Sequence, residues 1–200
     1  SKVSKFAGAL KNQGLQKGDR AIIYMPMVPE AVVAMLACGR IGVIHSVVFG
    51  GFASNELASR IDDSKAKILI TSSCGFEPGR TVEYKPLVDE AINLAKHKID
   101  KMVLFQRSGH EVKLNTPMEV SWEEVVSSAS DTDCVEMNSN ELAYILYTSG
   151  TTGTPKGIVR DIGGHIVALK WTMKNIYNID TNDVWWSASD IGWIVGHSYI

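Results

Sequence analysis

In the first 105 residues, segments with apolar residues at a helical spacing of three and four alternate with short apolar runs typical of strands. Val3, Phe6 and Leu10 recur at three and four residues, which predicts an amphipathic helix that ends near Gly14. Further helices are predicted at residues 29–41, 54–63 and 85–96, and short apolar runs predict strands at residues 21–25, 43–49, 67–71 and 102–105. Because a helix separates each strand from the next, we predict an α/β fold of parallel sheets with crossover helices.

Local signals refine these elements. Apolar side chains surround the helix that begins at Pro29, so we expect it to pack against a sheet and to be covered on both sides. Ser54 is expected to cap the helix that follows it, and Ser121 is expected to open a short helix through a capping box. Ser, Gly and Pro at residues 72–82 predict a loop. A polar connector at residues 128–140 predicts a break between subdomains.

A glycine-rich loop organises the second half of the chain. An apolar run at residues 142–146 leads directly into Tyr-Thr-Ser-Gly-Thr-Thr-Gly-Thr-Pro-Lys-Gly at residues 147–157. Glycines let backbone N–H groups approach an anion, hydroxyl groups add donors and Lys156 adds positive charge, so we predict a site for nucleotide phosphates. A flexible surface turn is the alternative. A Walker A loop is disfavoured, because Pro155 and Gly157 stand where that motif needs Gly and Ser or Thr, and an extended segment follows.

Composition narrows the classes of protein further. A net charge of −2 and a pI near 6.2 leave no broad basic surface, so no nucleic acid partner is expected. The longest apolar run, at residues 31–38, is shorter than the roughly 20 residues that span a bilayer, so no membrane partner is expected. Cys38, Cys74 and Cys134 are few, odd in number and far apart. Their pattern excludes a zinc ribbon or a disulfide framework, fits a reducing compartment and predicts no metal site.

The loop at residues 147–157 resembles the signature of the AMP-forming acyl-CoA synthetases and of other adenylate-forming enzymes. Further matches occur in order along the chain at residues 17–20, 24–30, 45–52 and 190–199. They resemble the short-chain branch of the family, the acetyl-CoA and propionyl-CoA synthetases. Residues 159–165 and 192–197 are closer to the propionate ligases, because acetate ligases usually carry threonine where this chain has Val195. The resemblance implies part of the large N-terminal domain of the adenylate-forming fold.

The same resemblance implies a reaction of two steps. A small carboxylic acid, here propionate, attacks the α-phosphate of ATP with its Mg²⁺, which gives an acyl-adenylate and pyrophosphate; the thiol of CoA then displaces AMP. ATP and CoA are the implied co-substrates. The implied phosphate-binding residues are Thr148, Ser149, Gly150, Thr151, Thr152, Gly153 and Lys156. Lys156 is also implied in catalysis, as a mobile positive charge beside the leaving pyrophosphate.

An acyl pocket and a CoA contact follow from the resemblance as well. The implied acyl pocket consists of Trp193, Ile194 and Val195. Arg80 and Val195 are the implied CoA-binding residues, with a solvated loop arginine as the alternative for Arg80. Glu77 stands where family members often carry a second arginine. His197 is implied as a catalytic residue that orients the carboxylate or the adenylate, with a structural role as the alternative. His45 and Trp193 are expected mainly to pack.

Members of this family are much longer than this chain. We therefore expect a part of the N-terminal domain of a ligase, which lacks the C-terminal lysine that drives adenylation and makes no acyl-CoA alone. The alternatives are an acetate–CoA ligase, another acyl-adenylating enzyme, or a nucleotide-binding remnant without turnover. The expected location is the cytoplasm, or the mitochondrial matrix if a transit peptide precedes residue 1.

Overall fold

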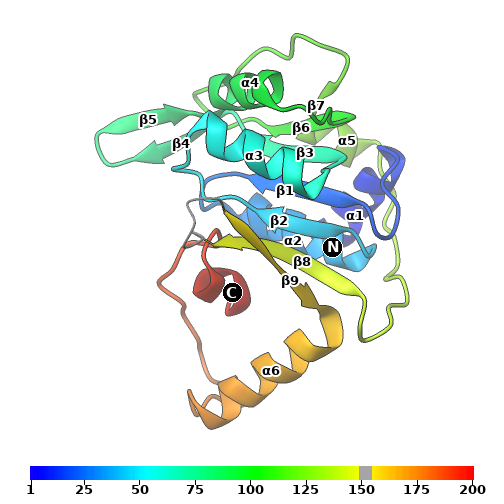
Figure 1. The fold of residues 1–200 in the computed structure, drawn as a ribbon, viewed down its shortest axis with the longest axis vertical. Coiled ribbons are helices and arrows are strands. Elements are labelled where there is room, and N and C mark those ends of the chain that lie inside the picture. The colour runs from blue at the N-terminus through cyan, green and yellow to red at the C-terminus, as the bar shows by residue number, and fades with distance from the viewer. Residues whose placement is uncertain (149–154) are drawn as a thin grey trace.

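A seven-stranded sheet with helices on both faces forms the body of the molecule (Figure 1). The computed structural model describes residues 1–148 and 155–200. The strands are β1 (Arg20–Tyr24), β2 (Ile44–Val47), β3 (Ile68–Ser72), β6 (Lys101–Phe105), β7 (Glu119–Ser121), β8 (Leu142–Thr148) and β9 (Lys156–Asp161). Their order is β7-β6-β3-β1-β2-β8-β9, and neighbours are parallel except β8 and β9, which are antiparallel. The predicted α/β class is confirmed.

Two apolar cores lie on opposite faces of this sheet. The helices on one face are α1 (Lys2–Asn12), α2 (Pro29–Arg40) and α5 (Trp122–Ser127), and those on the other are α3 (Ser54–Ser64) and α4 (Tyr84–Leu94). Successive residues of β1 serve the two cores in turn, because Ile23 packs into the first core and Ile22 and Tyr24 pack into the second. The strands β1, β2 and β3 are buried on both faces, which explains why they read as continuous apolar runs.

The two predicted helix caps have different outcomes. Ser121 does cap α5, since its Oγ accepts a hydrogen bond from the backbone N–H of Glu124 at 3.4 Å. Ala53 occupies the cap position of α3, and the Ser54 hydroxyl donates instead to Glu90 on α4 at 2.8 Å. The prediction for Ser54 was wrong because its side chain has a partner on the neighbouring helix.

A β-hairpin replaces the loop that was predicted at residues 72–82. Its strands, β4 (Cys74–Glu77) and β5 (Arg80–Glu83), are antiparallel and project from the main sheet (Figure 1). Gly79 has a φ of +78°, a conformation that favours glycine at the turn. The loop prediction was wrong because β5 has no buried residue, so its sequence carries little apolar signal.

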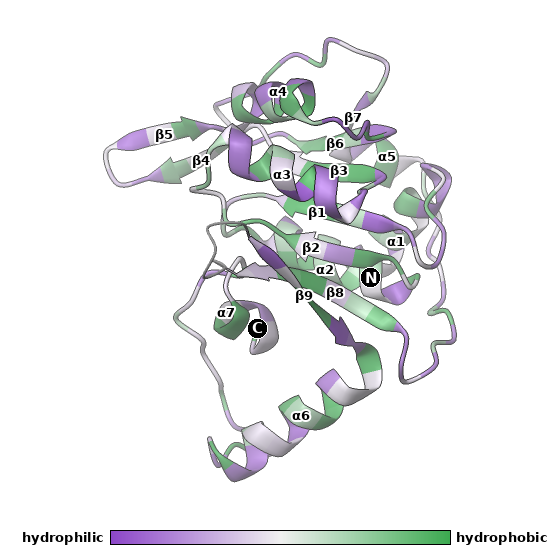
Figure 2. Cartoon of the chain, in the orientation of Figure 1, coloured by the Kyte–Doolittle hydropathy of each residue, from purple (hydrophilic) through white to green (hydrophobic). Residues whose placement is uncertain are grey.

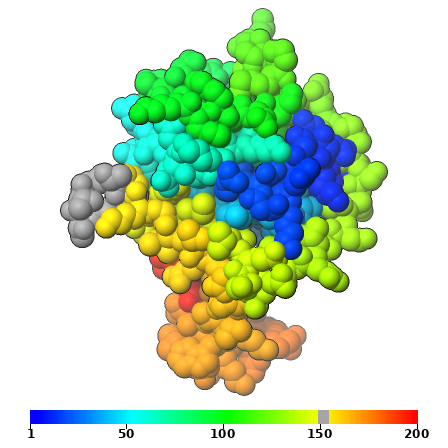
Figure 3. Space-filling view, turned by 45° about the vertical axis from the view of Figure 1, so that its right-hand side comes forward, coloured from blue at the N-terminus to red at the C-terminus, as the bar shows by residue number. Residues whose placement is uncertain are grey.

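The last part of the chain extends away from the sheet. β9 leads into α6 (Ile162–Asn175), and α7 (Ile194–Ser198) then lies close to β8 (Figure 1). The Asp161 carboxylate caps α6 by accepting the N–H of Gly164. No residue of α6 is buried, although many are apolar (Figure 2), and the orange residues of this part project from the body (Figure 3). None of the helices in the two described ranges is long and apolar enough to cross a bilayer.

The helix α2 is covered less completely than predicted. Its residues Ala34, Ala37 and Cys38 are fully buried, but Leu36 is 53% exposed. Leu36 borders an open apolar hollow that also touches Ile166 of α6. Cover on both sides was therefore a wrong prediction, because α6 stands away from α2 across this hollow.

The polar connector at residues 128–140 follows the surface of α1 and α2. The carbonyl oxygen of Thr132 accepts hydrogen bonds from the Ser4 hydroxyl at 2.9 Å and from Nε of Arg40 at 2.7 Å. Beyond the connector, β8 joins the same sheet as the neighbour of β2. The subdomain break stays a prediction.

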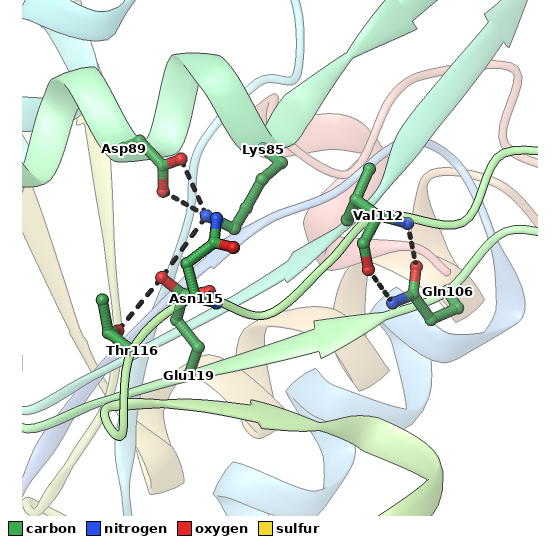
Figure 4. A network of polar contacts seen from close by, with 7 residues as sticks. All are labelled: Lys85, Asp89, Gln106, Val112, Asn115, Thr116 and Glu119. Atoms are coloured by element: carbon green, nitrogen blue, oxygen red, sulfur yellow. Dashed lines mark hydrogen bonds and ion pairs between the residues drawn. The ribbon is translucent and has the colours of Figure 1, made fainter.

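A buried ion pair ties the start of β7 to α4 (Figure 4). Nζ of Lys85 lies 2.6 Å from an Asp89 carboxylate oxygen and 3.4 Å from the Glu119 carboxylate. Glu119 also accepts hydrogen bonds from the Asn115 N–H and the Thr116 hydroxyl. The Lys85 and Glu119 side chains are 7% and 6% exposed, so solvent screens this pair little.

We expect Lys85→Ala to destabilise the fold by about 3–5 kcal/mol, because it leaves the buried Glu119 carboxylate without its cation. The free energy of unfolding from urea titration measures this. The control is Lys101→Ala, which removes an exposed hydrogen bond to the Pro117 carbonyl and should change stability by less than about 0.5 kcal/mol. Equal losses in the two variants would contradict the assignment.

Candidate active site

The strands β8 and β9 hold the two ends of the glycine-rich loop side by side. Thr148 is in register with Lys156 across this antiparallel pair, and both side chains are exposed. The predicted phosphate-binding residues Ser149, Gly150, Thr151, Thr152 and Gly153 lie outside the described residues. The loop follows the carboxyl end of β8, the edge at which ligands bind open α/β sheets.

Side chains of α3 anchor the start of this loop. The Tyr147 hydroxyl donates to Asp63 at 2.7 Å, and the Arg60 guanidinium lies 5.3 Å from the centre of the Tyr147 ring. Burial, with a smaller contribution from Asp63, raises the pKa of the Tyr147 phenol, so this hydroxyl remains a donor at neutral pH. Arg60 is itself buried and paired with Glu56 at 2.7 Å. The last residues of β8 are therefore fixed to a helix.

Close backbone contacts position the segment before α7. A Cβ on Gly192 would lie 2.8 Å from Cα of Phe49, so only glycine lets these two backbone segments approach each other this closely. The Gly192 N–H donates to the Asp190 carboxylate at 2.7 Å, while burial raises the pKa of Asp190. The Trp193 ring packs against Phe49 and Phe52, with centroids 5.5 and 6.2 Å apart, as expected for a packing residue.

A cavity of about 380 Å³ lies between the helices α6 and α7 and the strands β8 and β9. It is lined by Tyr144, Arg160, Asp161, Gly164, His165, Ala168, Leu169, Thr172, Ile194, Val195, Ser198 and Tyr199. Ile194 and Val195 of the predicted acyl pocket are thus brought to one cavity, whereas Trp193 is not part of its lining. Its walls combine apolar side chains with the charges of Arg160 and Asp161, a mixture that suits a small ligand with one polar end.

Two buried histidines meet beneath α7. Nε2 of His45 on β2 lies 2.9 Å from Nε2 of His197 on α7. The Tyr144 ring of β8 packs beside the pair, with its centroid 4.1 Å from that of His197 and the two rings tilted by 44°. His165 of α6 contacts the other side of Tyr144, at 4.9 Å between centroids. Sequence reasoning treated His45 as a packing residue and missed this pair. A histidine inside an apolar strand was the available signal, because a buried ring nitrogen needs a partner.

Both histidines of the pair are neutral at neutral pH. Burial lowers the pKa of His197 to about 4, with His165 adding to the effect. Burial, with a further contribution from the neighbouring His197, also lowers the pKa of His45. One ring therefore donates its Nε2–H and the other accepts it. The two Nδ1 atoms are buried and have no hydrogen-bond partner among the described residues.

The predicted CoA contact Arg80 lies elsewhere, on the projecting β-hairpin (Figure 1). Its side chain is 71% exposed, and its guanidinium contacts the Glu77 carboxylate through two nitrogens at 2.7 Å. Arg80 does not line the cavity that holds Val195. A role of Arg80 in CoA binding stays a prediction, and Glu77 would compete with a phosphate for the same guanidinium.

No group of three or more His, Cys, Asp or Glu side chains within residues 1–148 and 155–200 is arranged to hold a metal ion. A Mg²⁺ ion that arrives with ATP is a part of the substrate and is outside this observation.

A mostly parallel α/β sheet in which a strand leads at its carboxyl end into a glycine-rich loop is typical of nucleotide-binding α/β proteins. Residues 1–200 match the family described as AMP-binding enzyme, and the chain belongs to this family.

Several acyl-CoA synthetases match nearly the whole chain. Over 199 residues the chain is 55% identical to acyl-CoA synthetase short-chain family member 3, mitochondrial, of Rattus norvegicus. The aligned part is 99% of this chain and 29% of the relative. The chain is 47% identical over 201 residues to acetyl-coenzyme A synthetase of Vibrio cholerae, covering 99% and 31% of the two chains. These matches confirm the resemblance to the short-chain acyl-CoA synthetases. The chain spans about three tenths of the length of these relatives.

The fold has a solved counterpart in acetoacetyl-CoA synthetase from Streptomyces lividans. The two structures superpose with a TM-score of 0.88 over 98% of this chain and 30% of the other, at 23% sequence identity. At this identity the likeness shows the fold alone.

The buried histidine pair should make the fold sensitive to acid. An unfolded histidine binds a proton near its ordinary pKa of 6.5, whereas folded His197 binds one only near pH 4. The unfolded state therefore takes up more protons between these values, so stability is complete above pH 6.5 and falls as the pH drops towards 4.

For His197 alone the expected loss is about 3 kcal/mol by pH 4. Urea unfolding at pH 7.5 and 4.5 measures the difference, and replacing both His45 and His197 by Gln should flatten it. Parallel pH dependence in the two proteins would contradict the assignment.

Proposed function

We propose that a protein of the relatives' length that contains this chain is a short-chain fatty acid–CoA ligase. It would convert propionate, ATP and CoA into propionyl-CoA, AMP and pyrophosphate through an acyl-adenylate. The observation that carries this proposal is the 55% identity to a short-chain acyl-CoA synthetase across 99% of the chain. This chain would supply part of the N-terminal domain, and the C-terminal lysine that drives adenylation would lie outside it.

In the first step a carboxylate oxygen of the acid attacks the α-phosphorus of ATP, and the bond to the β-phosphate breaks. Thr148, the loop that follows it and Lys156 would hold the β- and γ-phosphates, where Lys156 offsets the charge of the leaving pyrophosphate. The exposed positions of Thr148 and Lys156 at the base of the loop support this role. In the second step the CoA sulfur attacks the acyl carbon and AMP leaves.

The alkyl tail of the acid would lie against Ile194 and Val195 in the cavity between α6 and α7. Both side chains face this cavity, and neither brings a polar atom. One buried methylene contributes about 0.8 kcal/mol, and apolar pockets separate acids that differ by one methylene by only ~1–3 kcal/mol. Propionate would therefore be preferred over acetate without being required.

The remaining assignments rest on the family. Arg80 would contact the 3′-phosphate of CoA, and Val195 would border the path of its thiol. His197 would take the structural role, because its ring does not line the cavity that holds Ile194 and Val195 and is paired with His45 instead. The proposed partners are a small carboxylic acid, ATP with Mg²⁺, and CoA, without nucleic acid or membrane. The word mitochondrial in the name of the rat relative supports the mitochondrial matrix, with the cytoplasm as the alternative.

An acid panel with the full-length protein tests the function. We expect acid-dependent exchange of pyrophosphate into ATP, with kcat/KM highest for propionate and about 10-fold lower for acetate. The 200-residue chain alone should show background exchange only. Exchange that is highest with long-chain acids or with amino acids would favour another adenylating enzyme. ATP binding without exchange by the full-length protein would favour a remnant without turnover.

Val195→Thr should lower the kcat/KM ratio of propionate to acetate by about 5-fold, because a hydroxyl replaces a methyl group at nearly constant volume in the acyl wall. Steady-state kinetics with both acids measures the ratio. The control is Val184→Thr at a side chain that is 95% exposed, which should leave the ratio unchanged. An unchanged ratio in the Val195 variant would remove this residue from the acyl pocket.

A further inference from the structure

We propose that His45 is a positioning residue for the acyl pocket: its hydrogen bond to His197 fixes α7 against the sheet and thereby places Ile194 and Val195. The inference rests on the proposed function, since it concerns the same pocket.

Different residues of α7 border the cavity and the sheet. Ile194 and Val195 are 44% and 47% exposed and border the cavity, whereas His197 is 6% exposed and does not. His197 borders instead the apolar hollow on the α2 side, together with His45. Because Ile194, Val195 and His197 belong to the same short helix, the contact that holds His197 also sets the position of the cavity wall.

The contact that holds His197 is a specific one. Its Nε2 lies 2.9 Å from Nε2 of His45, and no other side chain of α7 hydrogen-bonds to a strand within the described ranges. A helix of five residues has no stability of its own, because helix formation in isolation needs about 12–15 residues. The position of α7 therefore depends on its contacts, and this hydrogen bond is a directional one among them.

His45 is well placed to serve as the fixed end. It is paired with Ala21 of β1 on one side and with Tyr144 of β8 on the other, so its backbone is held in the middle of the sheet. Tyr144 also packs against His197, with the two rings tilted by 44°, and borders the cavity. The sheet thus presents one hydrogen-bonding atom and one aromatic face to α7.

Loss of the His45 ring would leave His197 with two buried nitrogens that lack partners. A buried polar group without a partner is unfavourable enough to move a single-turn helix to a position where water can reach the ring. The wall formed by Ile194 and Val195 would move with it. The phosphate-binding end of the site would be unaffected, because Tyr147 is anchored separately to Asp63 on α3.

The test uses the full-length protein with His45→Gln and His45→Asn. These substitutions carry the same amide and differ by one methylene. Gln places its amide where Nε2 of histidine lies and can either donate or accept, whereas Asn is too short to reach His197. We expect Asn to raise the KM for propionate about 10-fold and to narrow the preference among acetate, propionate and butyrate, with Gln within about 3-fold of the unchanged protein. The KM for ATP should stay within about 2-fold in both variants.

The matched control is Ser46→Ala on the same strand, where a buried hydroxyl without a partner among the described residues is removed. It should leave all three acid preferences unchanged. Equal KM values for propionate in the Asn and Gln variants would overturn the proposal, as would a parallel rise in the KM for ATP. If the unchanged protein ligates none of the short acids, the proposed function fails first, and that result is visible before any variant is measured.

Discussion

The parallel pairing of β2 with β8 is the interaction on which the rest of this structure depends. It joins the α/β unit built from the first 105 residues to the strand that carries the glycine-rich loop. The register of that pairing sets His45 beside Tyr144. Both ends of the candidate site therefore take their positions from the same two strands.

From β8 outward, the site is held by two anchors of different chemistry. On the α3 side, a charged and aromatic group of Arg60, Asp63 and Tyr147 fixes the start of the loop. On the α7 side, a neutral histidine pair and a glycine contact at Phe49 fix the cavity wall. The wall is the less covered of the two regions, since α6 has no buried residue and borders it.

The parallel strands and their crossover helices could be predicted from the sequence, because both faces of the sheet are buried and the apolar runs are long and regular. The family could be predicted because the motif at residues 147–157 is long. The hairpin at Gly79 and the Ser54 contact with Glu90 could not, since the first has few buried residues and the second depends on a helix 36 residues away in the chain. The cavity wall at Val195 was predicted through resemblance alone, and the histidine pair joins residues 152 positions apart.

A hydrogen bond between two neutral rings has a consequence for the proposed nucleotide site. The strength of an ion pair at the same place would change when the negative charge of ATP arrives and again when pyrophosphate leaves. The His45–His197 contact contains one shared proton and no net charge at neutral pH. If the proposed function holds, the cavity wall at Ile194 and Val195 is held by a contact whose strength changes little as the charges of ATP and pyrophosphate come and go.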